Sequence, residues 1–547
     1  MALGVSPESS VNRASGRLTS RMMMMTDYVF PTLGEAAQAL LNSTGLLAQK
    51  NNPSEILKDE KAKKTFQTKL RRLANEEGDV EKSFQDVAVY LLGLVTEATR
   101  DIRVANAFMA SVEDLYHSFR NAKREWATYL DKENTVRWLF ECGLADVVVK
   151  SAQKYSLMYG LAVSELSSPV APNWWLPEFA EDKVVWPLEK VWCWIYETAD
   201  TSQSRFHNPN GEPGRAQQNL ENVERWFNRN RLPQWGELVT NLESSLALLA
   251  ACPDPKYKRT LTESEVKSFR VHLFFARMAT DVLKAIDKAF GREFIRQLCR
   301  DMKAQNRRLA QMHAQWKAEI ELELTCIGPL AGREYYAFWK EAVHGRWAWF
   351  NHLMTPGLRA FQELLSRKEG EPLSLAELKQ ARGMLPSHIL AALMRMLRHK
   401  LADKDKAFAE FFLEGVKLRK LPDLSVDRIE AYKKRIDAAG QSGTLSWLVE
   451  WMYATYFYRR NEHRAAYPHY RKAFDLAKHS IGEDTYLLIN QYAESCAKND
   501  KRNEFSQVIR WANHNGVKIR WYRGEDDHDK AIELAYTFLK MASYPVV

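Results

Sequence analysis

Five basic side chains in the middle of the chain could together bind a phosphate backbone. They are Arg296, Arg300, Lys303, Arg307 and Arg308. Their spacing of three or four residues places them on one broad face of a single predicted helix. Such a stripe neutralises successive phosphates of a nucleic acid, and binding of that kind weakens steeply as salt is added. Acidic residues such as Asp301 interrupt the stripe, so an ordinary solvated helix face is the alternative interpretation.

A second pattern pairs an arginine with a histidine that follows after four or five intervening residues. Such pairs begin at Arg308, Arg346, Arg382, Arg464 and Arg523. The pattern resembles the R-x4-6-H motif of the all-α HEPN ribonucleases. The resemblance implies that the arginine holds a phosphate and the histidine transfers a proton without a metal ion. The pair Arg346 and His352 is the best placed, beside Trp347 and Trp349. Because the chain has 13 histidines and many arginines, chance matches arise, and the motif alone does not select an enzyme.

The usual signatures of nucleotide, hydrolase and metal sites are missing from the sequence. There is no GxxxxGK[ST] loop, no GxGxxG after a predicted strand, no GxSxG and no HExxH. Three histidines gather at His463, His469 and His479, but they form no i, i+4 pair and no Asp or Cys completes a ligand set. We therefore expect no cofactor and no metal site, and the sequence disfavours an ATPase, a dinucleotide enzyme, an α/β-hydrolase or a zincin.

Cysteine usage and charge restrict the compartment and the partners. Six cysteines are scattered without a CxxC pair, and no signal peptide is recognisable, which indicates a reducing cytoplasm and argues against structural zinc. No run of about 18 apolar residues exists, so we expect no membrane-spanning helix and no membrane partner. The net charge of +9 is a mild excess for 547 residues. It permits contact with nucleic acid or with an acidic partner without requiring either.

Long stretches of 3.6-residue periodicity, with few alternating or β-branched runs, predict an all-α fold. We expect multi-helix bundle blocks followed by a C-terminal helical solenoid. The 17 tryptophans are best explained as part of a large helical core, because each removes a large apolar surface from water when buried. Exposed aromatic side chains for partner contact are the alternative.

Small and aromatic residues recur at helical spacing between residues 447 and 480. The first predicted helix carries Tyr453, Ala454 and Phe457 on one face. The second carries Ala466, Tyr470 and Ala473 on one face. Small residues let two helices approach closely, and the aromatic side chains fill the space beside them. The pattern resembles a tetratricopeptide repeat over about residues 447–514. The resemblance implies a stack of helices that presents a surface to partners and carries no chemistry of its own.

A poorer copy of the same pattern follows. Its positions are Tyr492, Ala493 and Cys496, then Phe505, Ile509 and Ala512. Tyr492 follows Tyr453 by 39 residues (492 − 453), whereas the period of the family is about 34 residues, so an insertion near residues 479–484 is needed. A last amphipathic helix over Asp529–Met541 would cap the stack. We expect a protein partner to contact the concave surface of the repeats at Tyr456, Arg459, Arg460, Arg464 and Lys472.

Composition shifts divide the chain into six parts. They are a disordered leader (1–25), an N-terminal helical bundle (26–166), a Pro/Trp-rich crossover and polar loop (167–215), a middle helical block (216–370), a third helical block (371–440) and the repeat-like region (441–547). Residues 1–21 have a transit-like composition, but the methionines Met22–Met25 favour a leader or a later start. The polar loop Ser202–Gly214 is a candidate mobile or functional loop, with a plain surface loop as the alternative.

Together these observations predict a cytoplasmic, non-enzymatic scaffold or adaptor subunit of a larger assembly, which binds a protein partner through its C-terminal helices. A nucleic-acid-binding component of a bacterial defence or mobile-element complex is the first alternative. A metal-independent HEPN-like ribonuclease is the second.

Overall fold

The computed structural model describes residues 32–46, 60–125, 173–228, 232–365, 403–478, 485–522 and 528–541, apart from residues 77 and 182 and with isolated positions between 136 and 169. Within that part the chain is almost wholly helical, which confirms the predicted all-α class. Strands β1 (Glu178–Phe179) and β2 (Val184–Val185) form one antiparallel hairpin. The predicted leader (1–25) and residues 371–402 of the predicted third block lie outside the described residues.

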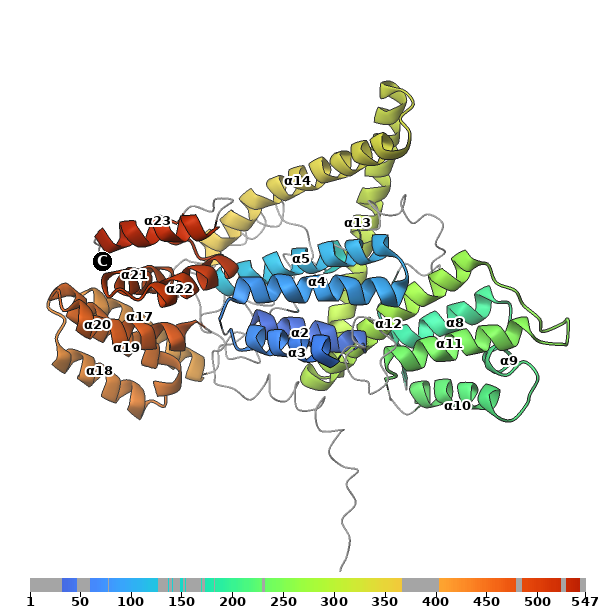
Figure 1. Cartoon of the computed structure of the whole chain (residues 1–547), viewed down its shortest axis with the longest axis horizontal. Helices are drawn as coiled ribbons and strands as arrows, with labels where there is room; N and C mark the ends of the chain where they lie inside the picture. Colours follow the sequence, from blue (N-terminus) through green and yellow to red (C-terminus); the bar gives the residue numbers. More distant parts are fainter. Residues whose placement is uncertain are drawn as a thin grey trace, which may run out of the picture.

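An N-terminal bundle occupies the centre of the elongated molecule (Figure 1). Its helices are α2 (Leu33–Thr44), α3 (Glu60–Ala74), α4 (Val80–Thr99) and α5 (Ile102–Glu125). Helix α2 begins with a capping box, because Thr32 Oγ1 accepts from the Glu35 amide at 3.0 Å and the Glu35 carboxylate accepts from the Thr32 amide at 2.9 Å. Gly34 lets α2 approach α3 closely, since a Cβ there would lie 2.1 Å from the Ala74 backbone nitrogen.

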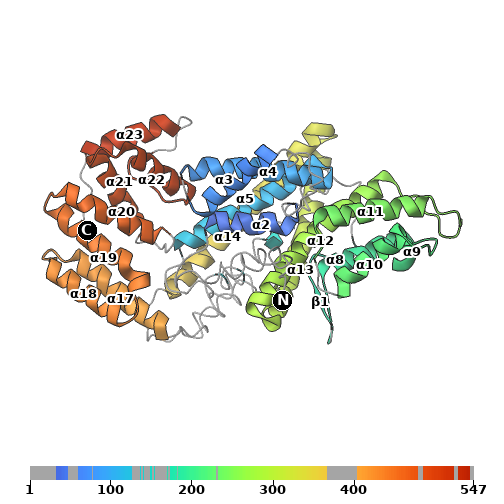
Figure 2. The same cartoon turned by 60° about the horizontal axis from the view of Figure 1, so that its bottom comes forward.

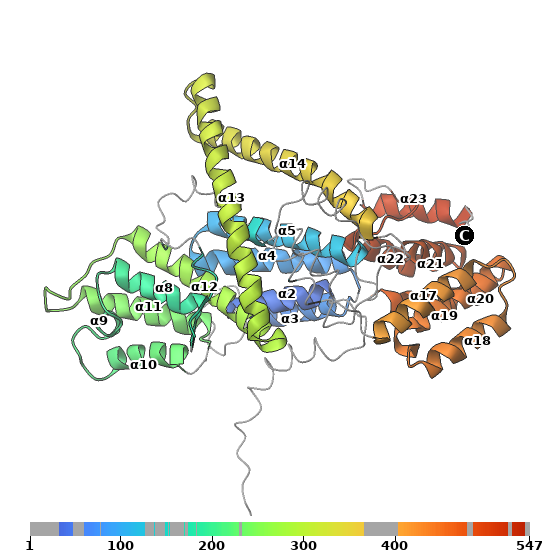
Figure 3. The same ribbon diagram turned by 180° about the vertical axis from the view of Figure 1, so that it is seen from behind.

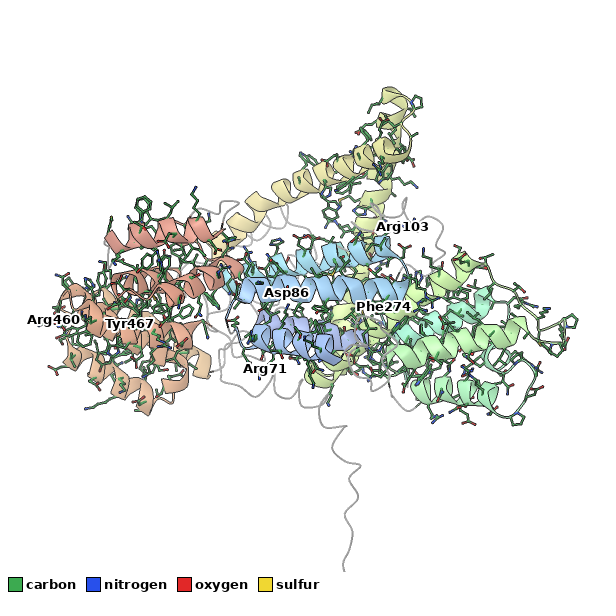
Figure 4. The ribbon with its side chains drawn as sticks, in the orientation of Figure 1. Arg71, Asp86, Arg103, Phe274, Arg460 and Tyr467 are labelled. Atoms are coloured by element: carbon green, nitrogen blue, oxygen red, sulfur yellow. The ribbon has the colours of Figure 1, made fainter. Side chains whose placement is uncertain are left out.

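Helix α12 (Glu263–Phe290) joins this bundle to a second group of helices beside it. That group also contains α8 (Pro187–Thr198), α9 (Gln203–His207), α10 (Arg215–Asn228) and α11 (Trp235–Ala250). Helix α12 packs against α2 and α4 on one side and against α8 on the other. It begins with a capping box formed by Thr262 and Glu265. Phe274 of α12 is fully buried and lies where this helix meets the bundle (Figure 4).

The predicted polar loop at 202–214 is partly folded into the core. Residues Gln203–His207 form α9, and His207 is fully buried. His207 Nε2 lies 2.8 Å from Tyr196 Oη, and His207 Nδ1 lies 2.8 Å from Ser245 Oγ. Burial lowers the pKa of His207 from 6.5 to about 3, so the ring is neutral at physiological pH. Through its two ring nitrogens, His207 connects α9 to both α8 and α11.

Helices α13 (Arg292–Ile327) and α14 (Gly332–Leu365) form a long hairpin whose tip projects from the body (Figures 1 and 3). A second apolar core holds the hairpin together through Trp316, Trp339 and Trp347. Ten of the fifteen tryptophans with described side chains are buried. Most of the described tryptophans therefore fill helical cores.

The C-terminal region is a series of helices in which neighbours along the chain pack together. They are α17 (Asp403–Lys420), α18 (Val426–Ala438), α19 (Ser442–Arg459), α20 (His463–Ala477), α21 (Thr485–Lys498), α22 (Arg502–His514) and α23 (His528–Met541). Trp451 Nε1 of α19 donates to Gln491 Oε1 of α21 at 2.7 Å, and both side chains are buried. The tetratricopeptide resemblance itself stays a prediction.

Helix α22 attaches the C-terminal helices to the N-terminal bundle, as both Figure 1 and Figure 2 show. Trp511 Nε1 donates to Glu76 Oε2 at 2.8 Å within the contact. Arg510 Nη1 lies 2.9 Å from Asp79 Oδ2. Residues more than 400 positions apart are thereby joined, and the main apolar core runs from the bundle into the C-terminal helices without a break.

Candidate partner-binding surface

The α19–α20 hairpin positions the contact residues that the sequence analysis named. Ala454 and Ala466, at the predicted contact between its helices, are both fully buried, which lets the two backbones approach closely. Asn461 turns the chain between the helices with a φ of 63°, a left-handed conformation that asparagine adopts more readily than most residues. The close packing of the two helices therefore fixes the backbone positions from which the outer side chains extend.

Tyr456, Arg460 and Arg464 lie at the end of this hairpin where the turn joins its two helices, and we call them the hairpin-end surface. The guanidinium carbon of Arg460 lies 5.2 Å from the centroid of the Tyr456 ring, and Arg460 Nη1 donates to Tyr456 Oη at 3.0 Å. Glu462 accepts from Arg460 Nε at 3.2 Å. Arg464 is exposed at the start of α20. Figure 4 shows Arg460 at the outer end of the C-terminal helices. Arg460 is thus oriented in advance by a stacking contact and two hydrogen bonds.

The other two predicted contact residues, Arg459 and Lys472, have partners within the chain. Arg459 donates to the backbone carbonyl of Leu421, and burial lowers its pKa. Lys472 Nζ lies 2.6 Å from one carboxylate oxygen of Glu450, and His469 Nδ1 lies 2.7 Å from the other. Burial opposes ionisation of Glu450, but the bonds from His469 and Lys472 outweigh it and lower the pKa of Glu450. These contacts brace the hairpin, and a role of Arg459 and Lys472 in partner binding stays a prediction.

The outer part of the hairpin is strongly basic. Residues 459–472 contain five arginine or lysine residues and one acidic residue, Glu462. Glu450 lies 2.6 Å from Lys472 and Glu504 lies 4.0 Å from Arg471, so the excess of positive charge lies toward the turn. Such a patch attracts acidic groups and raises the rate at which they associate.

Two members of the predicted nucleic-acid stripe on α13 are engaged within the chain. Arg296 Nη1 lies 3.3 Å from Glu293 Oε2, and its guanidinium lies over the Phe179 ring. Lys303 Nζ donates to the Pro177 carbonyl at 3.3 Å. Both side chains therefore hold α13 to its surroundings.

The other three members, Arg300, Arg307 and Arg308, are exposed. Among the described residues, no ion pair with an acidic side chain forms at any of them within 4.0 Å. Arg300 and Arg307 are seven residues apart, which is two helical turns and the same face. Helix α13 runs along the back of the molecule, facing the viewer in Figure 3. Of the five basic side chains in the predicted stripe, these three are exposed and have no acidic partner among the described residues.

The best-placed Arg–His pair is only partly described. Arg346 Nε lies 3.3 Å from Glu319 Oε2, and Arg346 Nη2 lies 2.6 Å from Glu323 Oε1. The Arg346 guanidinium, which under the HEPN resemblance would bind a phosphate, is therefore paired with two carboxylates of the same chain. His352 belongs to α14, but its side chain lies outside the described residues.

The described residues contain neither a metal-ligand cluster nor a membrane-spanning helix. No group of three or more His, Cys, Asp or Glu side chains is arranged to hold a metal ion there. Among the same residues, no helix combines the length and the apolar character that crossing a bilayer requires.

A buried charged network that was not predicted from the sequence joins α19 and α21. Tyr458 Oη donates to Glu494 Oε1 at 2.5 Å, and Lys498 Nζ lies 2.8 Å from the same oxygen. Glu494 is fully buried. The i, i+4 spacing of Glu494 and Lys498 was visible in the sequence, but nothing local indicated that this pair would be enclosed by α19.

No family model, curated protein or solved structure matches this chain. We therefore infer function from the side-chain geometry of the described residues.

Proposed function

We propose that this protein is a helical scaffold whose hairpin-end surface binds an acidic segment of a protein partner. The observation that carries the proposal is the oriented Arg460–Tyr456 pair beside the exposed Arg464, on a hairpin closed by buried alanines. Arginine and tyrosine are the residue types that most often dominate binding energy at protein interfaces. A guanidinium that is already oriented loses little conformational entropy when it meets a carboxylate.

Attachment of the C-terminal helices to the bundle supports the role of a scaffold. The buried Trp511–Glu76 hydrogen bond and the Arg510–Asp79 ion pair fix the direction in which the hairpin-end surface faces. A partner bound there is held in one orientation relative to the bundle.

A cytoplasmic location is part of the proposal. Five cysteines in the described part of the chain are free thiols: Cys193, Cys252, Cys299, Cys326 and Cys496. Free thiols are typical of proteins that work in a reducing compartment.

The test is a binding assay with the full chain and a short fluorescein-labelled peptide of alternating Glu and Ala. We expect saturable binding by fluorescence anisotropy that weakens as salt is added. Arg460→Glu combined with Arg464→Glu should weaken it about tenfold or more, because two attractive charges become repulsive. Arg428→Glu is the matched control, since Arg428 is also exposed in the C-terminal helices but lies on α18.

Affinity purification from cells then tests the protein partner itself. A stoichiometric partner should be retained by Arg428→Glu and lost with the double variant. A partner that both variants retain equally, together with unchanged peptide binding, refutes the hairpin-end surface as the binding site.

Nucleic-acid binding by α13 is a second candidate, favoured by the exposure of Arg300, Arg307 and Arg308. An electrophoretic shift should appear at low salt and fade in Arg300→Glu combined with Arg307→Glu. Lys317→Glu is the control, because Lys317 is an exposed base on the same helix. No shift with the wild-type chain at low salt eliminates this candidate.

A further inference from the structure

Helix α23 carries two apolar faces, and only one of them is covered by other described residues. The covered face packs against α21 and α22 through Ala531, Ile532, Ala535, Tyr536 and Leu539, all of them buried. The other face is a stripe at i, i+4 and i+7, formed by Leu534, Phe538 and Met541, which are 43%, 50% and 82% exposed. Trp521 extends it, because its ring is 45% exposed and stacks on Phe538 at a centroid distance of 5.4 Å.

The four side chains of this stripe leave on the order of 400 Å² of apolar surface open, a patch size that often marks an interaction site. Helix α23 lies at the edge of the C-terminal helices in Figures 1 and 3. Among the described residues, α21 and α22 pack on its covered side. The hairpin-end surface, by contrast, is formed by α19, α20 and the turn between them.

The charged side chains beside the stripe are arranged so that two copies of α23 can place opposite charges against each other. Glu533 and Lys540 are seven residues apart and therefore lie on the same flank of the stripe. Each is held by an opposite charge of its own chain, Glu533 by Arg502 and Lys540 by Asp500. Two α23 helices can pack antiparallel, related by a two-fold axis near Thr537. In that arrangement each Glu533 faces Lys540 of the other copy. The charges across the contact then alternate in sign, in the order Arg502, Glu533, Lys540, Asp500.

We propose that α23 is the interface of a symmetric homodimer, in which the stripes of two copies of this chain pack antiparallel. The two-fold axis places Leu534 of one copy near Met541 of the other and brings the two Phe538 rings together at the centre. An area of this size is small beside the roughly 800 Å² that each partner buries in a standard interface, so the dimer forms and dissociates with protein concentration.

Sedimentation velocity over a range of protein concentrations tests the proposal. The wild-type chain should move from 63.3 kDa to twice that mass as concentration rises. Leu534→Asp should raise the dissociation constant about tenfold or more, since it places a charge in the stripe of both copies. Leu322→Asp is the matched control, because Leu322 is another exposed helical leucine, on α13. Circular dichroism verifies that each variant is folded.

A charge exchange identifies the antiparallel arrangement. Glu533→Lys alone and Lys540→Glu alone should each weaken the dimer, because each puts like charges opposite one another. Carrying both substitutions should restore it, since the two exchanged charges would again face opposite charges of the other copy while the pairs within the chain stay broken. A wild-type chain that is monomeric at every concentration overturns the proposal. So does a dimer that Leu534→Asp leaves intact, or a double variant that fails to recover.

Discussion

Acidification should loosen α9 through a single histidine, His207. Its pKa is 6.5 in an exposed chain and about 3 in the fold, where it is enclosed between Tyr196 and Ser245. A depressed folded-state pKa means that the unfolded segment binds a proton which the folded segment does not. The stability that depends on the neutral ring is therefore fully present above pH 6.5 and is lost as pH falls toward 3.

The magnitude follows from the two pKa values. At a pH of about 5, the unfolded segment has gained about 1.5 pH units of protonation free energy over the folded one, or about 2 kcal/mol. His207→Gln removes this dependence, because an amide forms hydrogen bonds but does not titrate. The variant should be less stable near neutral pH, yet its stability should change about 2 kcal/mol less than that of the wild-type chain on acidification.

Hydrogen exchange at the amides of Phe206 and Asn208 measures the effect. These amides donate to Ser202 and Ser204 carbonyls at 2.8 and 2.9 Å, so they exchange when α9 opens. Opening free energies, corrected for intrinsic exchange, should converge between the wild-type chain and His207→Gln as pH falls. His117→Gln, which alters a half-exposed histidine on α5, should behave like the wild-type chain. Equal pH dependence in the wild-type chain and His207→Gln would refute the assignment to His207.

Four further substitutions probe the packing of the helices. Gly34→Ala should destabilise the chain by about 2 to 3 kcal/mol in urea unfolding, because the new methyl group meets backbone atoms of α3; Gly345→Ala has open space around it and should stabilise α14 by up to about 1 kcal/mol. Thr455→Val should raise stability by about 1 kcal/mol, since the buried Thr455 hydroxyl forms no hydrogen bond among the described residues. Trp511→Phe should weaken attachment of the C-terminal helices by about 1.5 to 3 kcal/mol and expose the junction to limited proteolysis.

Each of these expectations has its own contrary result. Equal losses in Gly34→Ala and Gly345→Ala would show that the space beside Gly34 is not limiting. Thr444→Val is the control for Thr455→Val, because Thr444 Oγ1 donates to the Gln441 carbonyl at 2.9 Å and its loss should destabilise. A Thr455→Val chain that melts below the wild-type chain would indicate a hydrogen bond at that hydroxyl. Unchanged proteolysis of Trp511→Phe would show that other contacts hold the junction.

Much of the local structure was predictable because it depends on neighbours in the sequence. The capping box at Thr262, which begins α12, is set by residues three apart. The predicted inward alanines Ala454 and Ala466 are buried, since the 3.6-residue period assigns them to one face of each helix. The amphipathic helix expected over Asp529–Met541 is present as α23.

The candidate site was predictable only in part, because the exposure of a charged side chain and its pairing within the chain depend on residues that are distant in sequence. Tyr456, Arg460 and Arg464 lie together at the turn of the α19–α20 hairpin, and their role in binding stays a prediction. Nothing in the sequence near Lys472 indicates that Glu450 on the preceding helix engages it. Likewise, nothing near Lys303 in the sequence indicates that it donates to the Pro177 carbonyl, whereas Arg300 and Arg307 on the same helix are exposed.

By itself, the sequence determined that the chain is helical and that Ala454 and Ala466 face inward, because periodicity acts over a few positions. The tertiary structure alone decided which polar groups are enclosed. It placed His207 between Tyr196 and Ser245, closed Arg346 between Glu319 and Glu323, and left one stripe of α23 open. The physical reason is that burial and ion pairing are set by the sum of contacts across the fold, which no local pattern encodes.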